Sequence, residues 1–301
     1  MSQENDLSSV AVMAEPESCP ICRSAMTGGR KSWLYQCAGC GFQQADLLPE
    51  IHDADARAAV DERRRATALG QLRAQNFERI LDRLAPLLPA GGKALLDVGC
   101  AHGWFLDAAS MRGIDAVGLE PDPAIGAVAA AGGRKVWSGF FPDDVPQGAQ
   151  FDVISFNDVL EHVPDVAGAV EACRRLLRPG GVLVINAPSS AGIFYRSAAA
   201  LDRLGIGGPF ARMWQTGFAS PHLSYFTPEQ LRRLVEQHGF TEIHRSSLPS
   251  VQVAGLWARL AYDRTASPAG NSLIWAAVVL FSPMIRHLPA DITLQMFRIA
   301  K

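Results

Sequence analysis

Short apolar runs alternate with segments of helical periodicity through the middle of the chain, from residue 93 to residue 188. The apolar runs predict five strands, over 93–99, 115–120, 135–139, 151–157 and 182–188. The periodic segments between them predict helices over 104–113, 122–133 and 166–177. Strands that alternate with helices indicate βαβ units, which form a parallel sheet buried on both faces.

The regions on either side of this alternation have different patterns. Before it, residues 53–88 place apolar residues at near-helical spacing, so we predict a helical linker over 46–88. After it, the stretch 189–226 begins with aromatic and glycine-rich sequence that has no clear period, and we predict a lid or insertion there. Beyond the lid, the pattern returns and predicts a helix over 229–238 and strands over 240–246 and 292–300.

Four cysteines form two CxxC pairs near the N-terminus, Cys19 with Cys22 and Cys37 with Cys40. Each pair offers two thiolates to one ion, and 14 residues separate the pairs. This spacing is close to that of tetrahedral zinc sites with four cysteine ligands. We therefore predict a structural zinc ribbon over 18–45, with no open coordination position for water. The alternative is a pair of redox-active dithiols.

The sequence LLDVGCAHGWF, residues 95–105, joins a predicted strand to a predicted helix. Such a turn presents backbone N–H groups to a ligand, and Gly99 and Gly103 allow close approach. Dinucleotide loops place a pyrophosphate here, which an acid just before Gly99 would disfavour. A cationic ligand accounts for Asp97, so the loop favours S-adenosylmethionine over NAD. Glu120, at the end of the next strand, is placed to accept hydrogen bonds from both ribose hydroxyls.

Charge and composition limit the classes of partner and location. The 301 residues carry a net charge of -2 at pH 7, so the chain has no overall basic field for nucleic acid. The first residues lack the features of a signal peptide, and no apolar run reaches about 20 residues. The best candidate, 272–285, is too short and contains Pro283. We therefore expect a cytoplasmic location with reduced cysteines.

Five motifs between residue 76 and the C-terminus resemble those of class I S-adenosylmethionine-dependent methyltransferases. They are LLDVGCAHG, VGLEPDP, FDVISFNDVLEHVPD, LLRPGGVLVINAP and SPHLSYFTPEQLRRLVEQHGF, in that order. The resemblance implies a Rossmann-like α/β domain over 89–301, with a seven-stranded, mostly parallel sheet, helices on both faces and an antiparallel last strand. The zinc ribbon and the helical linker precede this domain, and we expect residues 1–17 to be a flexible tail.

The resemblance also implies which residues surround the cofactor. They are Asp97, Gly99, Cys100, Ala101 and Gly103 at the methionine portion, Glu120 at the ribose, and Asn157 and Asp158 on the far side. Ala101 replaces a glycine that is usual in the family, and we attribute this to the absence of a pyrophosphate. The family often has an acid after the third strand to hold the adenine amine, where this chain has SGFF. We therefore expect Phe140 or Phe141 to pack on the adenine ring.

Two histidines are candidates for removing a proton from a hydroxyl acceptor. His162 follows the fourth predicted strand closely, at the edge where open α/β sheets bind ligands, and His222 lies in the segment SPHLSYF. For either histidine, the alternative is a role in ordering a loop through hydrogen bonds. Asp158, Glu161 and His162 also resemble a metal-binding trio of ubiquinone-pathway O-methyltransferases, which is a further alternative.

These features together favour methyl transfer to the oxygen of a small molecule, such as a sugar, a lipid-linked glycan, a quinone or a secondary metabolite. The apolar segment 250–290, with Trp257 and Trp275, suits a lipophilic acceptor or peripheral contact with a membrane. One alternative is a zinc-ribbon methyltransferase of ribosomal or transfer RNA, against which the acidic balance argues. The other is a catalytically silent protein whose ribbon docks a partner, against which Asp97 and Glu120 argue.

Overall fold

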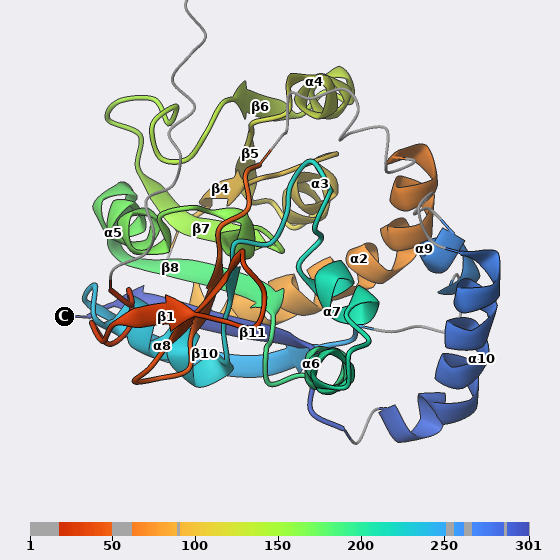
Figure 1. Cartoon of the computed structure of the whole chain (residues 1–301). Helices are drawn as coiled ribbons and strands as arrows, with labels where there is room; N and C mark the ends of the chain where they lie inside the picture. Colours follow the sequence, from red (N-terminus) through yellow and green to blue (C-terminus); the bar gives the residue numbers. More distant parts are fainter. Residues whose placement is uncertain are drawn as a thin grey trace, which may run out of the picture.

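A seven-stranded sheet lies at the centre of the protein (Figure 1). The computed structural model describes residues 18–49, 62–88, 91–250, 256–261, 267–285 and 288–300, so the predicted tail 1–17 lies outside the described residues. The strands of the sheet are β4 (Ala94–Val98), β5 (Asp115–Glu120), β6 (Lys135–Ser138), β7 (Phe151–Asn157), β8 (Leu177–Pro188), β10 (Phe240–Leu248) and β11 (Ile292–Ile299). Their order is β10-β11-β8-β7-β4-β5-β6. Strand β11 is antiparallel to both neighbours, as the resemblance implied, and the predicted fold is confirmed.

Helices cover both faces of the sheet because the central strands are apolar on both sides. Leu95 and Val153 face one core with Phe77 and Phe105, whereas their neighbours in sequence face the opposite core. The helices of the first layer are α2 (Glu62–Leu84), continued by η1 (Ala85–Leu87), and α3 (Trp104–Met111). Those of the second layer are α5 (Val166–Leu176) and α8 (Pro228–Glu236), while α4 (Pro123–Ala131) packs beside β5 and β6.

The segment RPGG, residues 178–181, lies within β8. Helix α5 ends at Leu176, and β8 begins at the next residue. The pairing with β7 then shifts, since Phe151 lies opposite Leu177 but Val153 lies opposite Val182. The four residues between these pairs therefore loop out of the ladder, and Gly180 adopts a φ of 79° there.

The predicted lid contains two helices that the sequence analysis did not predict, α6 (Ile193–Arg203) and α7 (Gly208–Met213), and the short strand β9 (Ser224–Tyr225). The buried side chains of α6 are Tyr195, Ala198 and Asp202, at helical spacing. An acid at a buried position interrupts the apolar pattern, so the periodicity was not visible. Asp202 is buried because Lys31 binds it, with 2.7 Å between Nζ and Oδ1.

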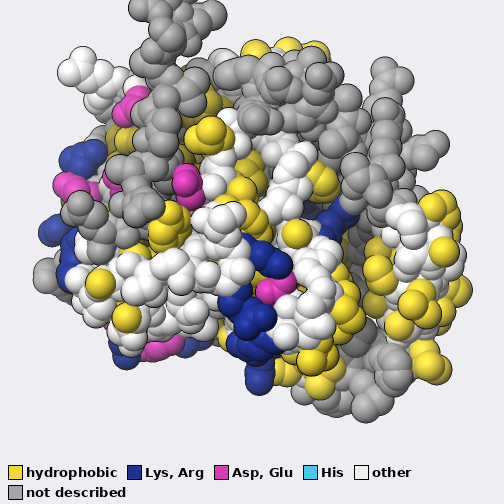
Figure 2. Space-filling model, in the orientation of Figure 1, with side chains coloured by type: hydrophobic (Ala, Val, Ile, Leu, Met, Phe, Trp, Pro, Cys, Tyr) yellow, Lys and Arg dark blue, Asp and Glu magenta, His cyan; other side chains and the backbone are white. Residues whose placement is uncertain are grey.

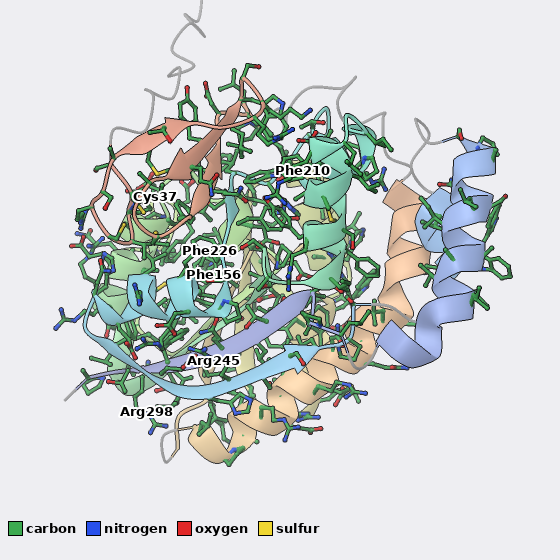
Figure 3. The ribbon with its side chains drawn as sticks, turned by 60° about the horizontal axis from the view of Figure 1, so that its bottom comes forward. Cys37, Phe156, Phe210, Phe226, Arg245 and Arg298 are labelled. Carbon is green, nitrogen blue, oxygen red and sulfur yellow. The ribbon has the colours of Figure 1, made fainter. Side chains whose placement is uncertain are left out.

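The N-terminal ribbon consists of β1 (Met26–Gly28), β2 (Leu34–Cys37) and β3 (Gln43–Ala45), paired antiparallel in sequence order. Its sheet has a fourth strand, because β9 of the lid pairs with β3. The rings of Phe42 and Phe226 meet at 5.2 Å, and Cys37 belongs to the same core as α8 (Figure 3). The ribbon is thus joined to the rest of the protein by backbone pairing as well as by side-chain packing.

The apolar segment predicted over 250–290 forms α9 (Leu256–Ala261) and α10 (Pro268–Ile285). Helix α9 packs against α2, and Asn271 of α10 donates a hydrogen bond to Leu260 O at 3.0 Å. Figure 1 shows α10 at the side of the molecule, away from the central sheet. Among the described residues, the length and apolar character needed to cross a membrane are found in no helix.

Candidate functional site

The loop after β4 turns through left-handed backbone at three alternate positions. The φ angles are 66° at Gly99, 46° at Ala101 and 74° at Gly103. A side chain at Gly99 would approach a Val159 methyl to 2.6 Å, so this position requires glycine. At Ala101 the backbone adopts a conformation that favours glycine, which costs an alanine about 1 kcal/mol. That the absence of a pyrophosphate allows an alanine here stays a prediction.

Glu120 holds this loop in place. Its two carboxylate oxygens accept hydrogen bonds from the Ala101 N–H and the Asp122 N–H, each at 2.9 Å. The side chain is buried at the end of β5, where the family resemblance expects the ribose carboxylate. Glu120 thus fixes the course of the loop through both of its carboxylate oxygens.

Cys100 fills the space left by a glycine on the neighbouring strand. A side chain at Gly118 would lie 2.3 Å from Cys100 Sγ, so the two positions are complementary. Burial raises the pKa of the Cys100 thiol above its ordinary value, and the nearby Asp97 and Glu120 charges add to the effect. A thiol held protonated in this way is a poor nucleophile. Cys100 is therefore a packing residue of the loop.

Asp97 is the buried acid at the carboxyl end of β4. Its Oδ1 accepts hydrogen bonds from Ser155 Oγ at 2.7 Å and from Asn157 Nδ2 at 2.8 Å. Asn186 Nδ2 donates in turn to Asn157 Oδ1 at 2.8 Å, so the chain of hydrogen bonds crosses β4, β7 and β8. Burial raises the pKa of Asp97 to about 7, the two hydrogen bonds oppose this, and the Glu120 charge reinforces it. Such a carboxyl is stabilised in its ionised form by a cationic ligand.

A cavity beside this network gathers residues from three parts of the chain. Five predicted cofactor residues line it: Asp97, Gly99, Cys100, Ala101 and Asn157. The sequence analysis missed its other lining residues, which are Arg73 and Phe77 of α2 and His102 and Trp104 at the start of α3. The rings of His102 and Trp104 stack at 5.1 Å. Arg73 adds a positive charge to this lining. Its position four residues before Phe77 places both side chains on the same side of α2, and this spacing is the signal in the sequence that could have identified it.

The remaining predicted cofactor residues lie outside the lining of this cavity. Gly103 begins α3, and Asp158 follows β7 with a φ of 55°. Phe140, after β6, is 50% exposed, while Phe141 packs its ring against Phe156 with 5.5 Å between centroids. Of the two candidates for stacking on adenine, Phe140 is thus the one with an open ring.

Glu161, His162 and His222 meet beneath the lid. Their ligand atoms lie within 4.8 Å of one another, and the two imidazole centroids are 4.7 Å apart. The structure thus groups Glu161 and His162 with His222, whereas the trio considered from the sequence had Asp158 in that place. Glu161 is 1% exposed, and burial, followed by the nearby Asp158 charge, raises its pKa well above the ordinary value. Within the described residues, Glu161 Oε2 has no hydrogen-bond partner.

The hydrogen bonds of the two histidines indicate which ring nitrogen carries the proton when each ring is neutral. His162 Nδ1 lies 2.8 Å from Pro221 O, which only accepts, so Nδ1 carries the proton and Nε2 the lone pair. Tyr225 Oη donates to Met213 O at 2.8 Å and therefore accepts from His222 Nδ1 at 3.0 Å. His222 Nε2 then accepts from Gln215 Nε2 at 2.7 Å. These hydrogen bonds engage both ring nitrogens of His222, which suits a positioning role.

Two hydrogen bonds of Leu223 tie the histidine cluster to the ribbon, and a third bond ties α6 to it. The Leu223 N–H donates to Glu161 O at 2.7 Å, and Leu223 O accepts from the Ala45 N–H at 2.9 Å. Tyr195 Oη of α6 donates to Gln43 Oε1. The residue that follows His222 is therefore held between the ribbon and the end of β7.

The four cysteines of the ribbon have the geometry of a tetrahedral sulfur site. All four Sγ atoms lie within 4.8 Å of one another, with 3.6 Å between Cys19 and Cys40 and 3.3 Å between Cys22 and Cys37. Zinc–sulfur bonds of about 2.3 Å at tetrahedral angles require about 3.8 Å. Backbone N–H groups point at the sulfurs, among them Gly39 N at 3.3 Å from Cys37 Sγ. The cysteines therefore fit a zinc ion.

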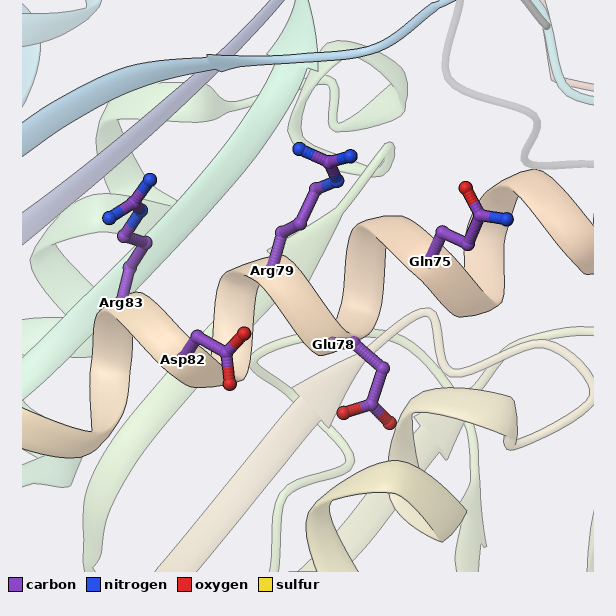
Figure 4. A pocket seen from close by; sticks show the side chains of 5 residues that line it. All are labelled: Gln75, Glu78, Arg79, Asp82 and Arg83. Carbon is purple, nitrogen blue, oxygen red and sulfur yellow. The ribbon is translucent and has the colours of Figure 1, made fainter.

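A second hollow runs along the outer side of α2, lined by Gln75, Glu78, Arg79, Asp82 and Arg83 (Figure 4). The figure shows Arg79 and Arg83 pointing to one side of the helix and Glu78 to the other. Glu78 and Asp82 both form ion pairs with Arg112 at the end of the neighbouring helix α3. These side chains do not converge on one point, so we assign no ligand to this hollow.

Comparison with known proteins agrees with the geometry of the cofactor loop. Residues 69–245 match the family model described as "Methyltransferase domain". The chain is 28% identical to a ubiquinone biosynthesis O-methyltransferase of Cereibacter sphaeroides over 193 residues, 62% of this chain and 74% of that protein. It is 36% identical to the enzyme of that name from Pseudomonas paraeruginosa over 104 residues, 32% of this chain and only 44% of that protein.

Solved structures show the same fold at low sequence identity. The cyclopropane synthase MmaA2 of Mycobacterium tuberculosis superposes with a TM-score of 0.57 and 19% identity, covering 85% of this chain and all of that chain. A putative methyltransferase from Haloferax volcanii, in a complex with its Trm112 activator, gives a TM-score of 0.55 and 17% identity, covering 84% and 99%. The family model covers more than half of the sequence, and the loop carries an acid suited to a cationic cofactor. The chain therefore belongs to the methyltransferase domain family and is an S-adenosylmethionine-dependent methyltransferase.

Proposed function

We propose that this protein methylates a hydroxyl oxygen of a small-molecule acceptor beneath the lid, with His162 as the general base. The observation that carries the proposal is the fixed tautomer of His162, because the bond from Nδ1 to Pro221 O leaves Nε2 as the basic atom. The similar ubiquinone biosynthesis O-methyltransferases support an oxygen acceptor. The net charge of -2 does not favour RNA, the alternative acceptor.

S-adenosylmethionine, when bound, supplies a methyl group on a positively charged sulfur. Asp97 and Asn157 would hold its methionine portion, Arg73 its carboxylate, and Glu120 its ribose hydroxyls. Transfer of a methyl group depends chiefly on alignment and on the exclusion of water. His222 orients the lid through Tyr225 and Gln215, and His162 Nε2 takes the proton of the acceptor hydroxyl.

Release of S-adenosylhomocysteine tests the assignment of His162, with a panel of quinols, sugars and hydroxylated lipids as acceptors. We expect His162→Gln to lower kcat by about 10²- to 10⁴-fold, the usual contribution of a general base. The affinity for S-adenosylmethionine should stay unchanged in the same variant, since His162 lies outside the cofactor cavity. His238→Gln, on the distant helix end after α8, is the matched control. Full activity of His162→Gln, or a strict requirement for an added divalent cation, would contradict the assignment and favour a metal site at Glu161, His162 and His222.

We also infer that Cys19, Cys22, Cys37 and Cys40 hold a structural zinc ion. The spacing of the sulfurs and the backbone N–H groups directed at them support this, as does the close fit at Gly39, where a side chain would meet Ser24 at 2.4 Å. The pKa of Cys22 is lowered to about 6 by hydrogen bonds from Ser24, which favours a thiolate there. Four thiolates complete the coordination, so the ion would have no position for a substrate.

Metal analysis of the purified protein tests this inference. We expect one zinc per chain and its loss in a Cys37→Ser, Cys40→Ser double variant. Cys173→Ala, which changes a buried cysteine of α5 outside the ribbon, should keep its zinc and serves as the control. An unchanged metal content in the double variant would refute the site.

A further inference from the structure

Helix α10 exposes apolar side chains over much of its described length. Its sequence, Pro268–Ile285, contains no Asp, Glu, Lys, Arg or His. All six residues from Ser272 to Ala277 are exposed, and Leu273 reaches 74%. Because successive helical residues are about 100° apart, these exposed residues point in several directions around the helix axis, whereas Asn271 is buried beside α9. Exposed apolar surface of this extent marks a site of interaction with a partner or a membrane.

A second exposed apolar group lies at the corner between α6 and α7. Leu204 is 78% exposed, and Ile206 and Leu201 are also exposed. Basic side chains surround this corner, because Arg203 is exposed next to Leu204, and Arg30 and Lys31 of the ribbon reach Asp202. Three positive charges face one acid there, so the corner is both apolar and net positive.

Helices α6, α7 and α10 lie on one side of the molecule (Figure 1). The Ile193 N–H at the start of α6 donates to Pro289 O at 3.2 Å, and the Phe194 N–H donates to Asp291 Oδ1 at 2.8 Å. These bonds tie α6 to the segment that follows α10. Figure 2 shows apolar side chains on α10 at the right, and basic beside apolar side chains near the centre of the same face.

We propose that this region is a docking surface for a membrane with anionic headgroups. The docking surface comprises α10, the corner residues Leu201, Leu204 and Ile206, and the basic residues Arg30, Lys31 and Arg203. Exposed leucine, isoleucine and tryptophan side chains of an uncharged helix can be buried at the boundary between the headgroups and the acyl chains of a bilayer. Trp257 of α9 and Trp275 of α10 are exposed, and tryptophan is enriched at that layer. The three basic residues supply the attraction to anionic lipid that an uncharged helix lacks.

The docking surface lies next to the lid that covers the histidine cluster. Helix α7 leads into Trp214, whose carbonyl accepts from the His222 N–H at 3.0 Å, and then into Gln215. The proposal goes beyond methyl transfer, since it concerns where the enzyme resides while it acts. It predicts that the lid faces lipid.

Co-sedimentation of the full-length protein with vesicles tests the proposal. We expect binding to vesicles of phosphatidylglycerol and phosphatidylcholine, weak binding to phosphatidylcholine alone, and a blue shift of tryptophan emission on binding. A Leu273→Asp, Ile274→Asp variant and a Leu204→Asp, Ile206→Asp variant should each bind at least about tenfold less. Arg30→Gln with Arg203→Gln should reduce the preference for anionic vesicles.

Met111→Asp is the matched control, because Met111 is an 86% exposed apolar residue on α3, outside the docking surface. It should bind vesicles as the unchanged protein does. Calorimetry with S-adenosylhomocysteine verifies that every variant is folded. Failure of the unchanged protein to bind anionic vesicles would overturn the proposal, as would equal loss of binding in Met111→Asp. Concentration-dependent dimerisation that the Leu273→Asp, Ile274→Asp variant abolishes, without vesicle binding, would assign α10 to a second copy of the chain instead.

Discussion

Lowering the pH from 8 to 6 is expected to weaken the binding of S-adenosylmethionine through Asp97. Burial raises the pKa of this carboxyl to about 7 in the cofactor-free protein. The positive charge of the cofactor favours the ionised carboxylate, so binding below pH 7 requires Asp97 to lose a proton. The dissociation constant therefore rises as the pH falls through 7.

The expected size of the effect follows from the pKa. A group with a pKa of about 7 is ionised to about 91% at pH 8 and about 9% at pH 6, so the dissociation constant changes about tenfold, or about 1.4 kcal/mol. Isothermal titration calorimetry at several pH values measures this change. Repeating the titration in two buffers with different ionisation enthalpies gives the number of protons that the protein releases when it binds the cofactor.

An Asp97→Asn variant separates this group from every other one that titrates, including the amine of the cofactor. Its amide oxygen can still accept from Ser155 and Asn157, so the hydrogen-bond network is preserved. We expect weaker binding in this variant and loss of the part of the pH dependence that belongs to Asp97. Asp115→Asn, at the opposite end of the sheet and exposed, is the control. If the dissociation constant of Asp97→Asn changed with pH as steeply as that of the unchanged protein, the reasoning would be refuted.

Two substitutions in and beside the cofactor loop test its packing. Ala101→Gly should raise the free energy of unfolding by about 1 kcal/mol, because the φ of 46° at this position suits glycine, and denaturant unfolding measures it; an unchanged or lower value would contradict a strained alanine. Gly118→Ala should lower the free energy of unfolding by about 1–3 kcal/mol, because the new side chain would meet Cys100 Sγ at 2.3 Å. Cys100→Gly in the same chain should recover part of that loss, and additive losses would show that the two positions do not interact.

The central sheet was predictable because its strands carry their own signal. Strands such as β7 are mostly apolar and end at polar residues, and β11 alternates well enough to be placed without its neighbours. The antiparallel direction of the last strand, in contrast, came from the family resemblance. Helices α6 and α7 were missed because one buried position of α6 is Asp202, whose partner Lys31 is far away in the sequence. Local periodicity cannot reveal a buried acid that a distant residue neutralises.

The candidate site, like the fold, contains residues that the sequence identifies and residues that it does not. Asp97 and Glu120 could be assigned because each ends a strand, and parallel strands bring such ends together at one edge. Arg73 reaches the cavity from a helix before the sheet, which no motif marks. His162 and His222 were both named, but their contact depends on the lid, which packs under the ribbon. The pairing of β3 with β9 involves only two residues of β9, too few to give a strand pattern.

The pairing of Gln43 with Tyr225 and of Gln44 with Ser224 also sets an order of events during synthesis. Strand β3 leaves the ribosome long before β9, because about 180 residues separate the two strands. At about 5–20 residues per second, β9 follows β3 by roughly 10–40 s. Through that interval one edge of the nascent ribbon stays open, and its backbone groups lack their final partner. Early capture of a metal ion by Cys19, Cys22, Cys37 and Cys40 would keep the three-stranded part folded until the chain that completes it arrives.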